Sequence, residues 1–253
     1  METRTVDVAI IGAGTAGLNA RRAVEKAGGQ PLLIESGVYG TTCARVGCMP
    51  SKLLIAAADA AHEVASADGF GIEVPDWRID GPRVLARVQR ERDRFAGMVA
   101  ANTEALPAEQ RLLGHARFTG TTTLEVDDHT RVEARAVVIA SGSSPFIPPP
   151  FDAIRADLLT SDNLFEQKTL PESLAVIGTG IIGLELGQAL QRLGVRVTFF
   201  NPFNELGPFT DPVVEQAAHA ILAAELDLQL QSSVQSATRV AAGVELRYVD
   251  QAG

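Results

Sequence analysis

Two glycine-rich segments with the same spacing constrain the fold of this chain most strongly. The first, GAGTAG at residues 12–17, follows an apolar strand pattern over 6–11 and leads into a helix pattern over 18–26. The second, GTGIIG at residues 178–183, follows a strand pattern over 174–177 and again leads into a helix pattern. Each segment therefore predicts a strand-turn-helix unit of the kind that binds the pyrophosphate of a dinucleotide.

The glycines of the first segment have separate expected roles. Gly12 allows a tight turn, Gly14 allows the backbone to approach a pyrophosphate, and Gly17 allows the helix to pack closely on the strand. The helix N-terminus supplies a positive dipole end. Glu35 ends the next strand pattern, over 31–34, at the place where an acid normally binds a ribose hydroxyl.

The second unit repeats this arrangement with Gly178, Gly180 and Gly183, and Asn201 follows its second strand pattern. The alternative for these glycines is helix–strand packing alone, without a ligand. Asparagine can bond a ribose hydroxyl but does not repel a 2′-phosphate, and no arginine follows until Arg239. The sequence thus favours NAD over NADP in this unit.

Both cysteines of the chain, Cys43 and Cys48, lie shortly after the first unit. Five helical steps would rise ~7.5 Å, beyond the ~7 Å Cα separation that a disulfide tolerates, so the backbone must tighten between them, most naturally at Gly47. The pair predicts a dithiol/disulfide redox centre beside a bound flavin. The alternative is two unrelated buried thiols. A structural metal is not expected, since the zinc-knuckle spacing is absent and the nearest histidine is His62.

Composition excludes several classes of function. With 46% hydrophobic and 5% aromatic residues, the 253-residue chain suits an α/β protein of two modest domains. Its net charge of -9 and the absence of a Lys/Arg cluster argue against nucleic acid. No apolar stretch is long enough to span a membrane, and no secretion signal is apparent. We therefore expect a cytoplasmic protein, in which a disulfide would be catalytic.

The remaining patterns divide the chain. Helices are predicted over about 48–66 and 82–104, short strands over 111–132 and a buried strand over 136–140. The proline-rich segment 146–150 is the strongest linker signal. We expect an FAD-binding domain over 1–150, with a helical insertion at about 48–105, and a partial NAD-binding domain over 151–253.

Together these segments resemble the flavin-dependent pyridine nucleotide-disulfide oxidoreductases, most closely dihydrolipoamide dehydrogenases. The resemblance covers nearly the whole chain and is carried by residues 12–17 with Glu35, 43–52, 140–145, 160–162 and 178–185. It implies an α/β fold with two Rossmann-like modules, of which the second is incomplete. It also implies that the C-terminal domain, through which the family normally forms homodimers, is absent. A strand pattern over 244–249, a turn over 250–253 and no returning strand agree with an incomplete module.

The resemblance also implies roles for particular residues. Cys43 would exchange with the substrate disulfide, and Cys48 would form the thiolate beside the flavin, favoured by a helix start and by the charge of Lys52. Lys52 would lie near the flavin ring and pair with Glu185 on the nicotinamide side, although it could instead be an ordinary surface lysine. The FAD contacts would be Gly12, Gly14, Gly17, Glu35, Lys52, Ala116, Ser141, Gly142 and Ser143. The NAD contacts would be Gly178, Gly180, Gly183 and Asn201.

The activity implied is FAD-dependent electron transfer between NAD and a small dithiol or disulfide such as lipoamide. Asn201 departs from the family pattern, because the NAD-using members carry an acid there. A mercuric reductase or a glutathione reductase shares the cysteine motif and is an alternative. A further alternative, of a different class, is a non-catalytic flavoprotein fragment that acts as a binding module.

Overall fold

The computed structural model describes residues 1–251, and the chain forms two compact units. Met1–Pro50 and Arg90–Ser144 make up the first unit, and Ser51–Gln89 together with the residues from Pro145 on make up the second. The expected boundary at residue 150 lies close to the division after Ser144. Residues 51–89, expected as an insertion in the first domain, group with the second unit.

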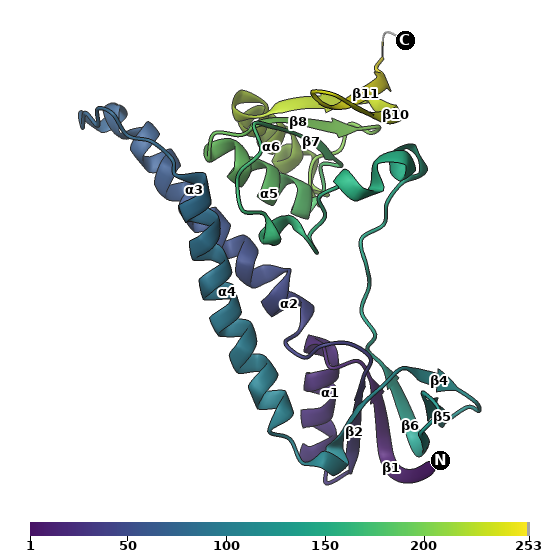
Figure 1. Cartoon of the computed structure of the whole chain (residues 1–253). Coiled ribbons are helices and arrows are strands. Elements are labelled where there is room, and N and C mark those ends of the chain that lie inside the picture. Colours follow the sequence, from purple (N-terminus) through teal and green to yellow (C-terminus); the bar gives the residue numbers. More distant parts are fainter. Residues whose placement is uncertain (252–253) are drawn as a thin grey trace. The chain divides into compact units, whose positions relative to one another are not determined.

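The first unit is built on a six-stranded sheet with the order β3-β2-β1-β6-β5-β4 (Figure 1). Strands β3, β2, β1 and β6 are parallel, whereas β5 and β4 continue antiparallel. The strands are β1 (Glu2–Ile11), β2 (Pro31–Glu35), β3 (Arg111–Leu113), β4 (Ala116–Phe118), β5 (Thr123–Val126) and β6 (Thr130–Ile139). The consecutive residues Leu32, Leu33 and Ile34 are all buried, as expected for a parallel strand covered on both faces.

Helices of the first unit begin close to the predicted positions. Helix α1 (Thr15–Lys26) starts directly after the first glycine turn and leads back to β2. The short α2 (Thr42–Arg45) precedes α3 (Cys48–Ala65), and α4 (Gly81–Glu104) returns toward β3. Helices α3 and α4 each continue from one unit into the other.

The second unit contains a parallel three-stranded sheet with the order β7-β8-β9. Its elements are β7 (Ser173–Ile177), α5 (Ile181–Arg192), β8 (Arg196–Asn201), α6 (Pro212–Glu225) and β9 (Asp227–Leu230). Short 3₁₀ helices lie at Ala67–Phe70, Pro149–Asp157 and Leu164–Glu166, and in the first unit at Ala108–Gln110. The proline-rich segment thus enters a 3₁₀ helix at Pro149, after the irregular residues that follow Ser141.

A hairpin completes the described part of the second unit. Strand β11 (Gly243–Val249) pairs antiparallel with β10 (Ser233–Val240). The strand over 244–249 was expected to be the first strand of a hairpin, whereas it is the second, because it pairs with β10, which was not predicted. The turn expected over 250–253 extends to residues 252 and 253, which lie outside the described residues.

The core of the second unit includes the middle of the helical pair. Leu54, Ala58 and Ala61 of α3, with Leu85 and Val88 of α4, are buried in one apolar cluster. The same cluster contains the buried apolar residues of α5 and of the neighbouring strands, namely Ala189, Leu190, Leu193, Val195, Val197 and Phe199. This burial explains why residues 51–89 belong with the second unit.

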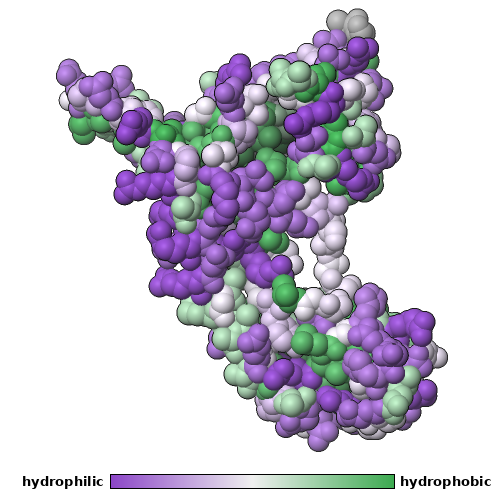
Figure 2. All heavy atoms as spheres, in the orientation of Figure 1, coloured by the Kyte–Doolittle hydropathy of each residue, from purple (hydrophilic) through white to green (hydrophobic). Residues whose placement is uncertain are grey.

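Hydrophilic residues cover most of the surface visible in Figure 2. Within residues 1–251, no helix combines the length and the apolar character needed to cross a membrane.

Two helical glycines are expected to respond in opposite ways to alanine. A Cβ on Gly17 would lie 1.9 Å from the Gly12 carbonyl oxygen, whereas one on Gly97 of α4 would meet nothing within 4 Å. We expect Gly17→Ala to destabilise the protein by ~3 kcal/mol through overpacking, and Gly97→Ala to stabilise it by ~0.5–1 kcal/mol through lower unfolded-chain entropy. Thermal unfolding followed by circular dichroism measures both, and an equal response of the two variants would contradict the packing role of Gly17.

Candidate active site

In the first glycine turn, the first and last glycines have no space for a Cβ atom, whereas the middle glycine has. Gly12 has φ +106°, and a Cβ there would lie 2.2 Å from the carbonyl oxygen of Ala140, at the end of β6. Gly17 is equally crowded against Gly12. Gly14 has an ordinary extended conformation, with φ -73° and ψ -174°, and a Cβ on it would meet no atom within 4 Å. Backbone geometry therefore does not require glycine at position 14, whereas close approach of a ligand would.

The Glu35 carboxylate is fixed at this turn before any ligand arrives. Its Oε2 accepts a hydrogen bond from the Ala13 amide at 2.7 Å, and its Oε1 accepts one from the Gly37 amide at 2.9 Å. Helix α1 begins without a side-chain cap at Gly14, so its first amides can donate to an anion. The turn thus presents hydrogen-bond donors beside a held carboxylate.

The other expected FAD contacts occupy two places in the first unit. Ala116 is the first residue of β4 and is half-buried. Ser141, Gly142 and Ser143 are exposed and follow the end of β6 that crowds Gly12, and Gly142 has φ +74°. The segment 141–143 therefore starts beside the first glycine turn.

The second glycine turn resembles the first at its middle and last glycines. Gly178 has φ +97°, and a Cβ on Gly183 would lie 2.4 Å from the Gly178 carbonyl oxygen. Gly180 has φ -71° and ψ 176°, has open space at its Cβ, and precedes α5 without a side-chain cap. Both turns therefore have an open middle glycine and a crowded last glycine, whereas a Cβ on Gly178, unlike one on Gly12, would meet no atom within 4 Å.

Asn201 ends β8 as Glu35 ends β2, but its side chain is occupied differently. The buried Asn201 amide donates from Nδ2 to Thr179 Oγ1 and, at 2.9 Å, to the Glu205 carbonyl oxygen. Its Oδ1 accepts from the Phe203 amide at 3.2 Å. Both donor hydrogens are thus used internally, and the remaining capacity to bind a ribose hydroxyl is a lone pair on Oδ1.

Each unit has a cavity beside its second and third strands. In the first unit, a cavity of about 430 Å³ is lined by Gly37, Val38, Tyr39, Glu104, Arg111 and Leu113. In the second unit, a cavity of about 320 Å³ lies against α6, β9 and the segment after β8, where Asn204, His219, Ala223, Asp227, Leu230 and Gln231 contribute to its wall. Volumes of this size accommodate small ligands.

The two thiols meet across a break between helices. Cys43 lies in α2 and is half-buried, and Cys48 begins α3 and is exposed. The structure holds both as thiols. A Cβ on Gly47 would lie 3.2 Å from Cys43 Cα and 3.2 Å from the Thr42 carbonyl oxygen, so Gly47 lets the chain fold tightly against Cys43. The bend occurs at the predicted residue.

Thr41, which the sequence analysis did not single out, holds the start of this segment. Its backbone has φ 58° and ψ 146°, a conformation that is strained for a β-branched residue and costs ~1–3 kcal/mol. Its Oγ1 accepts a hydrogen bond from the Ala44 amide at 3.1 Å and so caps α2. The sequence shows a threonine two residues before Cys43. It does not reveal the strained backbone angle of that threonine.

The hydrogen bond between the two thiols affects the ionisation of Cys43. The hydrogen bond to the Cys48 side chain, together with partial burial, raises the pKa of the Cys43 thiol. A raised pKa means that less Cys43 thiolate is present at a given pH.

Removing the Cys48 sulfur should make Cys43 react at lower pH. In Cys48→Ala the hydrogen bond and the charge of Cys48 are both lost, so we expect the pKa of Cys43 to fall toward that of an ordinary thiol. The measurement is the pH dependence of iodoacetamide alkylation at Cys43, followed by mass spectrometry. An unchanged or higher midpoint in Cys48→Ala would show that the two thiols do not interact.

Lys52 and Glu185 are joined in the second unit. Lys52 Nζ lies 2.6 Å from Glu185 Oε1, although α3 and α5 supply the two side chains from distant parts of the sequence. The expected pairing of these side chains is present, and their place beside a nicotinamide stays a prediction. Among the described residues, no group of three or more His, Cys, Asp and Glu side chains could hold a metal ion.

The sequence profile described as pyridine nucleotide-disulphide oxidoreductase matches residues 6–252. The chain is 30% identical to a dihydrolipoyl dehydrogenase of Synechocystis over 252 residues, which are 96% of this chain and 53% of that protein. It is 38% identical to a mercuric reductase of Streptomyces lividans, over 76% of this chain and 42% of that protein. It is 31% identical to a mycothione reductase of Mycobacterium tuberculosis, over 97% of this chain and 54% of that protein.

A solved structure shows the same fold. It is the Cu(II) complex of the HOCl-induced flavoprotein disulfide reductase RclA from Escherichia coli, which matches with a TM-score of 0.79 at 23% identity. The match covers 96% of this chain and 53% of that one. The chain thus spans about half the length of the relatives it matches. With two dinucleotide-type turns, a close thiol pair and a profile match along almost its whole length, the chain belongs to the pyridine nucleotide-disulphide oxidoreductase family.

Proposed function

We propose that this chain carries the electron path of an FAD-dependent dithiol/disulfide oxidoreductase, which connects NAD with a small disulfide or dithiol through Cys43 and Cys48. The observation that carries the proposal is the contact between the two thiols, which the tight turn at Gly47 brings together. The family relatives support it, since all those named above are reductases or dehydrogenases.

The first unit fits the adenosine and pyrophosphate parts of FAD. Gly14 leaves open space at the uncapped start of α1. The carboxylate oxygens of Glu35 can accept hydrogen bonds from ribose hydroxyl groups. The cavity next to Gly37 has room for an adenosine. Bound FAD would supply two-electron transfer between a pyridine nucleotide and the cysteine pair.

The cysteine pair can reduce a substrate disulfide in two exchange steps. The Cys43 sulfur attacks one substrate sulfur, which forms a mixed disulfide and releases the first substrate thiol. The Cys48 thiolate then attacks the Cys43 sulfur, which releases the second substrate thiol and leaves a Cys43–Cys48 disulfide. Two electrons pass from the cysteines to the substrate. Cys43 gives its proton to the first substrate sulfur, and the second takes a proton from solvent, to which Cys48 lost one when it ionised. Oxidation of a dithiol such as dihydrolipoamide runs these steps in reverse.

The second unit fits a pyridine nucleotide by an open middle glycine at an uncapped helix start, as in the first unit. Gly180 is open, and Asn201 is neutral, so nothing at this position repels a 2′-phosphate. We propose NAD because the chain carries no arginine between Asn201 and Arg239 that could bind such a phosphate. Lipoamide is the proposed substrate class, with mercuric, mycothione and glutathione reductase activities as alternatives. A reducing compartment such as the cytoplasm suits thiols that are reformed in each cycle.

The test begins with the purified chain and FAD. After incubation and desalting, we expect about one flavin per chain and two thiols that appear only after mild reduction of the air-oxidised protein. NADH should then bleach the flavin at lower concentrations than NADPH. A panel of lipoamide, mycothione, glutathione disulfide and Hg²⁺ identifies the acceptor. A colourless protein with two inert thiols in air would reject the proposal and favour the non-catalytic binding module.

A further inference from the structure

Two ion pairs connect α3 with α5 inside the second unit. Lys52 pairs with Glu185, and Arg192 Nη1 lies 2.9 Å from Asp59 Oδ1. On each helix the second charged residue follows the first by seven positions, which is about two helical turns. The two helices therefore run side by side in the same direction and in one register.

Small and medium-sized apolar side chains line the seam between the two helices. The buried residues of α3 are Leu54, Ala58 and Ala61, and those of α5 include Ala189 and Leu190. Repeating small and medium-sized apolar side chains can interdigitate in more than one register, and polar positions are what select one. The charged residues at the edge of the seam are therefore the candidates for this role.

The order of charges opposes a slip of the helices. Helix α3 supplies Lys52 and then Asp59, whereas α5 supplies Glu185 and then Arg192. A displacement by two turns would bring Lys52 against Arg192, or Asp59 against Glu185. Like charges at such positions are destabilising, so the reversed order selects the observed register.

The two pairs are not equally well built. The side chains of Lys52 and Glu185 are 60% and 38% exposed, and exposed pairs of this kind contribute little. The Arg192 side chain is only 20% exposed. Its Nε and Nη2 donate to the two carboxylate oxygens of Glu225 at 2.6 and 3.2 Å, while its Nη1 reaches Asp59. A planar guanidinium suits this double task, and an ammonium does not.

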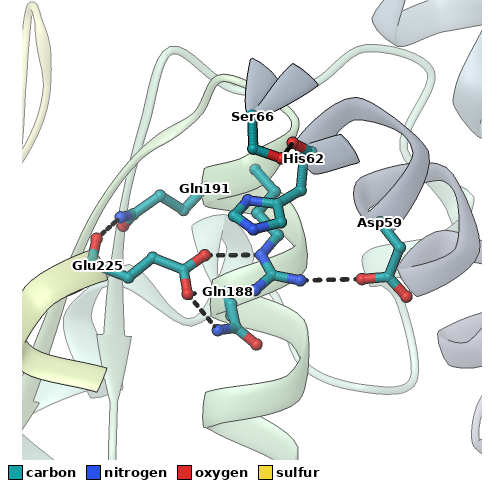
Figure 3. Close-up of polar contacts among 7 residues, drawn as sticks. Asp59, His62, Ser66, Gln188, Gln191 and Glu225 are labelled. Atoms are coloured by element: carbon teal, nitrogen blue, oxygen red, sulfur yellow. Dashed lines mark hydrogen bonds and ion pairs between the residues drawn. The ribbon is translucent and has the colours of Figure 1, made fainter. Parts of the chain in front are cut away.

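Further contacts hold Glu225, the last residue of α6, in place (Figure 3). Gln188 Nε2 donates to Glu225 Oε2 at 2.7 Å, and Gln191 donates to the Glu225 carbonyl oxygen. The hydrogen bond with Arg192 lowers the pKa of Glu225, partial burial raises it, and the hydrogen bond with Gln188 lowers it further, so that the net shift is downward. Figure 3 shows His62 and Asp59 projecting from α3 into this network.

We infer that Arg192 is a positioning residue: by fixing α3 on α5 and α6, it sets the register in which Lys52 meets Glu185. The position is specific to the second unit, since Lys26 at the corresponding end of α1 is exposed. The significance of the Lys52–Glu185 pair for electron transfer rests on the proposed function. The register itself does not.

Distances between spin labels test the register without any cofactor. Ala60 of α3 and Ile182 of α5 are exposed, and both can be replaced by cysteine in a Cys43→Ser/Cys48→Ser background. The labelled protein should give one narrow distance by electron–electron double resonance. Arg192→Gln should broaden it or add a second population displaced along the helix by ~11 Å, two helical turns. Arg192→Lys should restore it in part.

Arg155→Gln is the matched control, since Arg155 forms an exposed pair with Asp152 at 2.7 Å in the same unit. It should leave the distance unchanged. A single narrow, unshifted distance in Arg192→Gln would overturn the inference. So would an equal broadening in Arg155→Gln.

The route through Lys52 is tested in the flavin-loaded protein by stopped-flow reduction with NADH. Arg192→Gln should slow flavin reduction by ~10–100-fold without loss of flavin, as expected for a misplaced group. Lys52→Met should then add less in the Arg192→Gln background than it does alone. Independent effects would overturn the positioning of Lys52. If the protein binds no flavin, the proposed function fails, and the label distances still decide the role of Arg192.

Discussion

Gly14→Val is expected to remove nearly all bound FAD, whereas Gly180→Val should keep FAD and weaken NADH binding. Both glycines have backbone angles that valine can adopt, and a Cβ on either would meet no protein atom within 4 Å. The added side chain would instead occupy the space through which a pyrophosphate approaches each helix start. We expect each affinity to fall on the order of 10²-fold, the upper end of typical overpacking costs.

The pair of variants supplies its own control. Flavin content after desalting and the NADH concentration for half-maximal flavin reduction are measured in both, together with thermal unfolding. Similar unfolding temperatures would show that both proteins fold. Retention of flavin by Gly14→Val would refute the assignment of FAD to the first unit. Loss of flavin from Gly180→Val alone would assign FAD to the second unit instead.

Cys43→Ser and Cys48→Ser should each abolish disulfide reduction, with a loss on the order of 10⁴-fold, since loss of a catalytic nucleophile typically has effects of this size or larger. A serine hydroxyl at either position cannot complete the internal disulfide that releases the second substrate thiol. The measurement is steady-state reduction of the acceptor identified from the panel, with NADH as the donor.

Electron transfer that bypasses the thiols is the control for the cysteine variants. Both serine variants should keep flavin and should still pass electrons from NADH to an artificial acceptor, because that reaction needs only the cofactor sites. A serine variant that retained more than a small fraction of disulfide reduction would remove its cysteine from the proposed path.

Local steric patterns made much of the fold predictable. The first helix was expected over 18–26 and begins at Thr15, and the long helices over 48–66 and 82–104 are observed at Cys48–Ala65 and Gly81–Glu104. Glycine turns and apolar periodicity act within a few residues of one another, so one sequence reveals them. The extension of β1 back to Glu2 was not predicted, because its polar residues are held by pairing with the distant β6.

The site likewise contains residues that local sequence patterns predict and residues that only the tertiary structure reveals. Gly12, Gly14, Gly17 and their counterparts were found from spacing, and Gly47 from the reach of a disulfide. Thr41 and the Arg192 network were missed, because a strained backbone angle and a set of ion pairs from three helices depend on tertiary structure. The grouping of residues 51–89 with the second unit likewise depends on which core buries Leu54 and Leu85.

The two glycine turns and the strands that follow them have the same length, although most of their residues differ. Gly12, Gly14, Gly17 and Glu35 each have a counterpart at a constant offset of 166 residues, which ends at Asn201. No residue has been gained or lost across either span, although most side chains differ. One inserted residue in α1 or α5 would rotate all later positions of that helix by ~100° and carry its buried face into solvent. Deletions and insertions should therefore be tolerated in the irregular segment that follows Ser144 far better than inside α1 or α5.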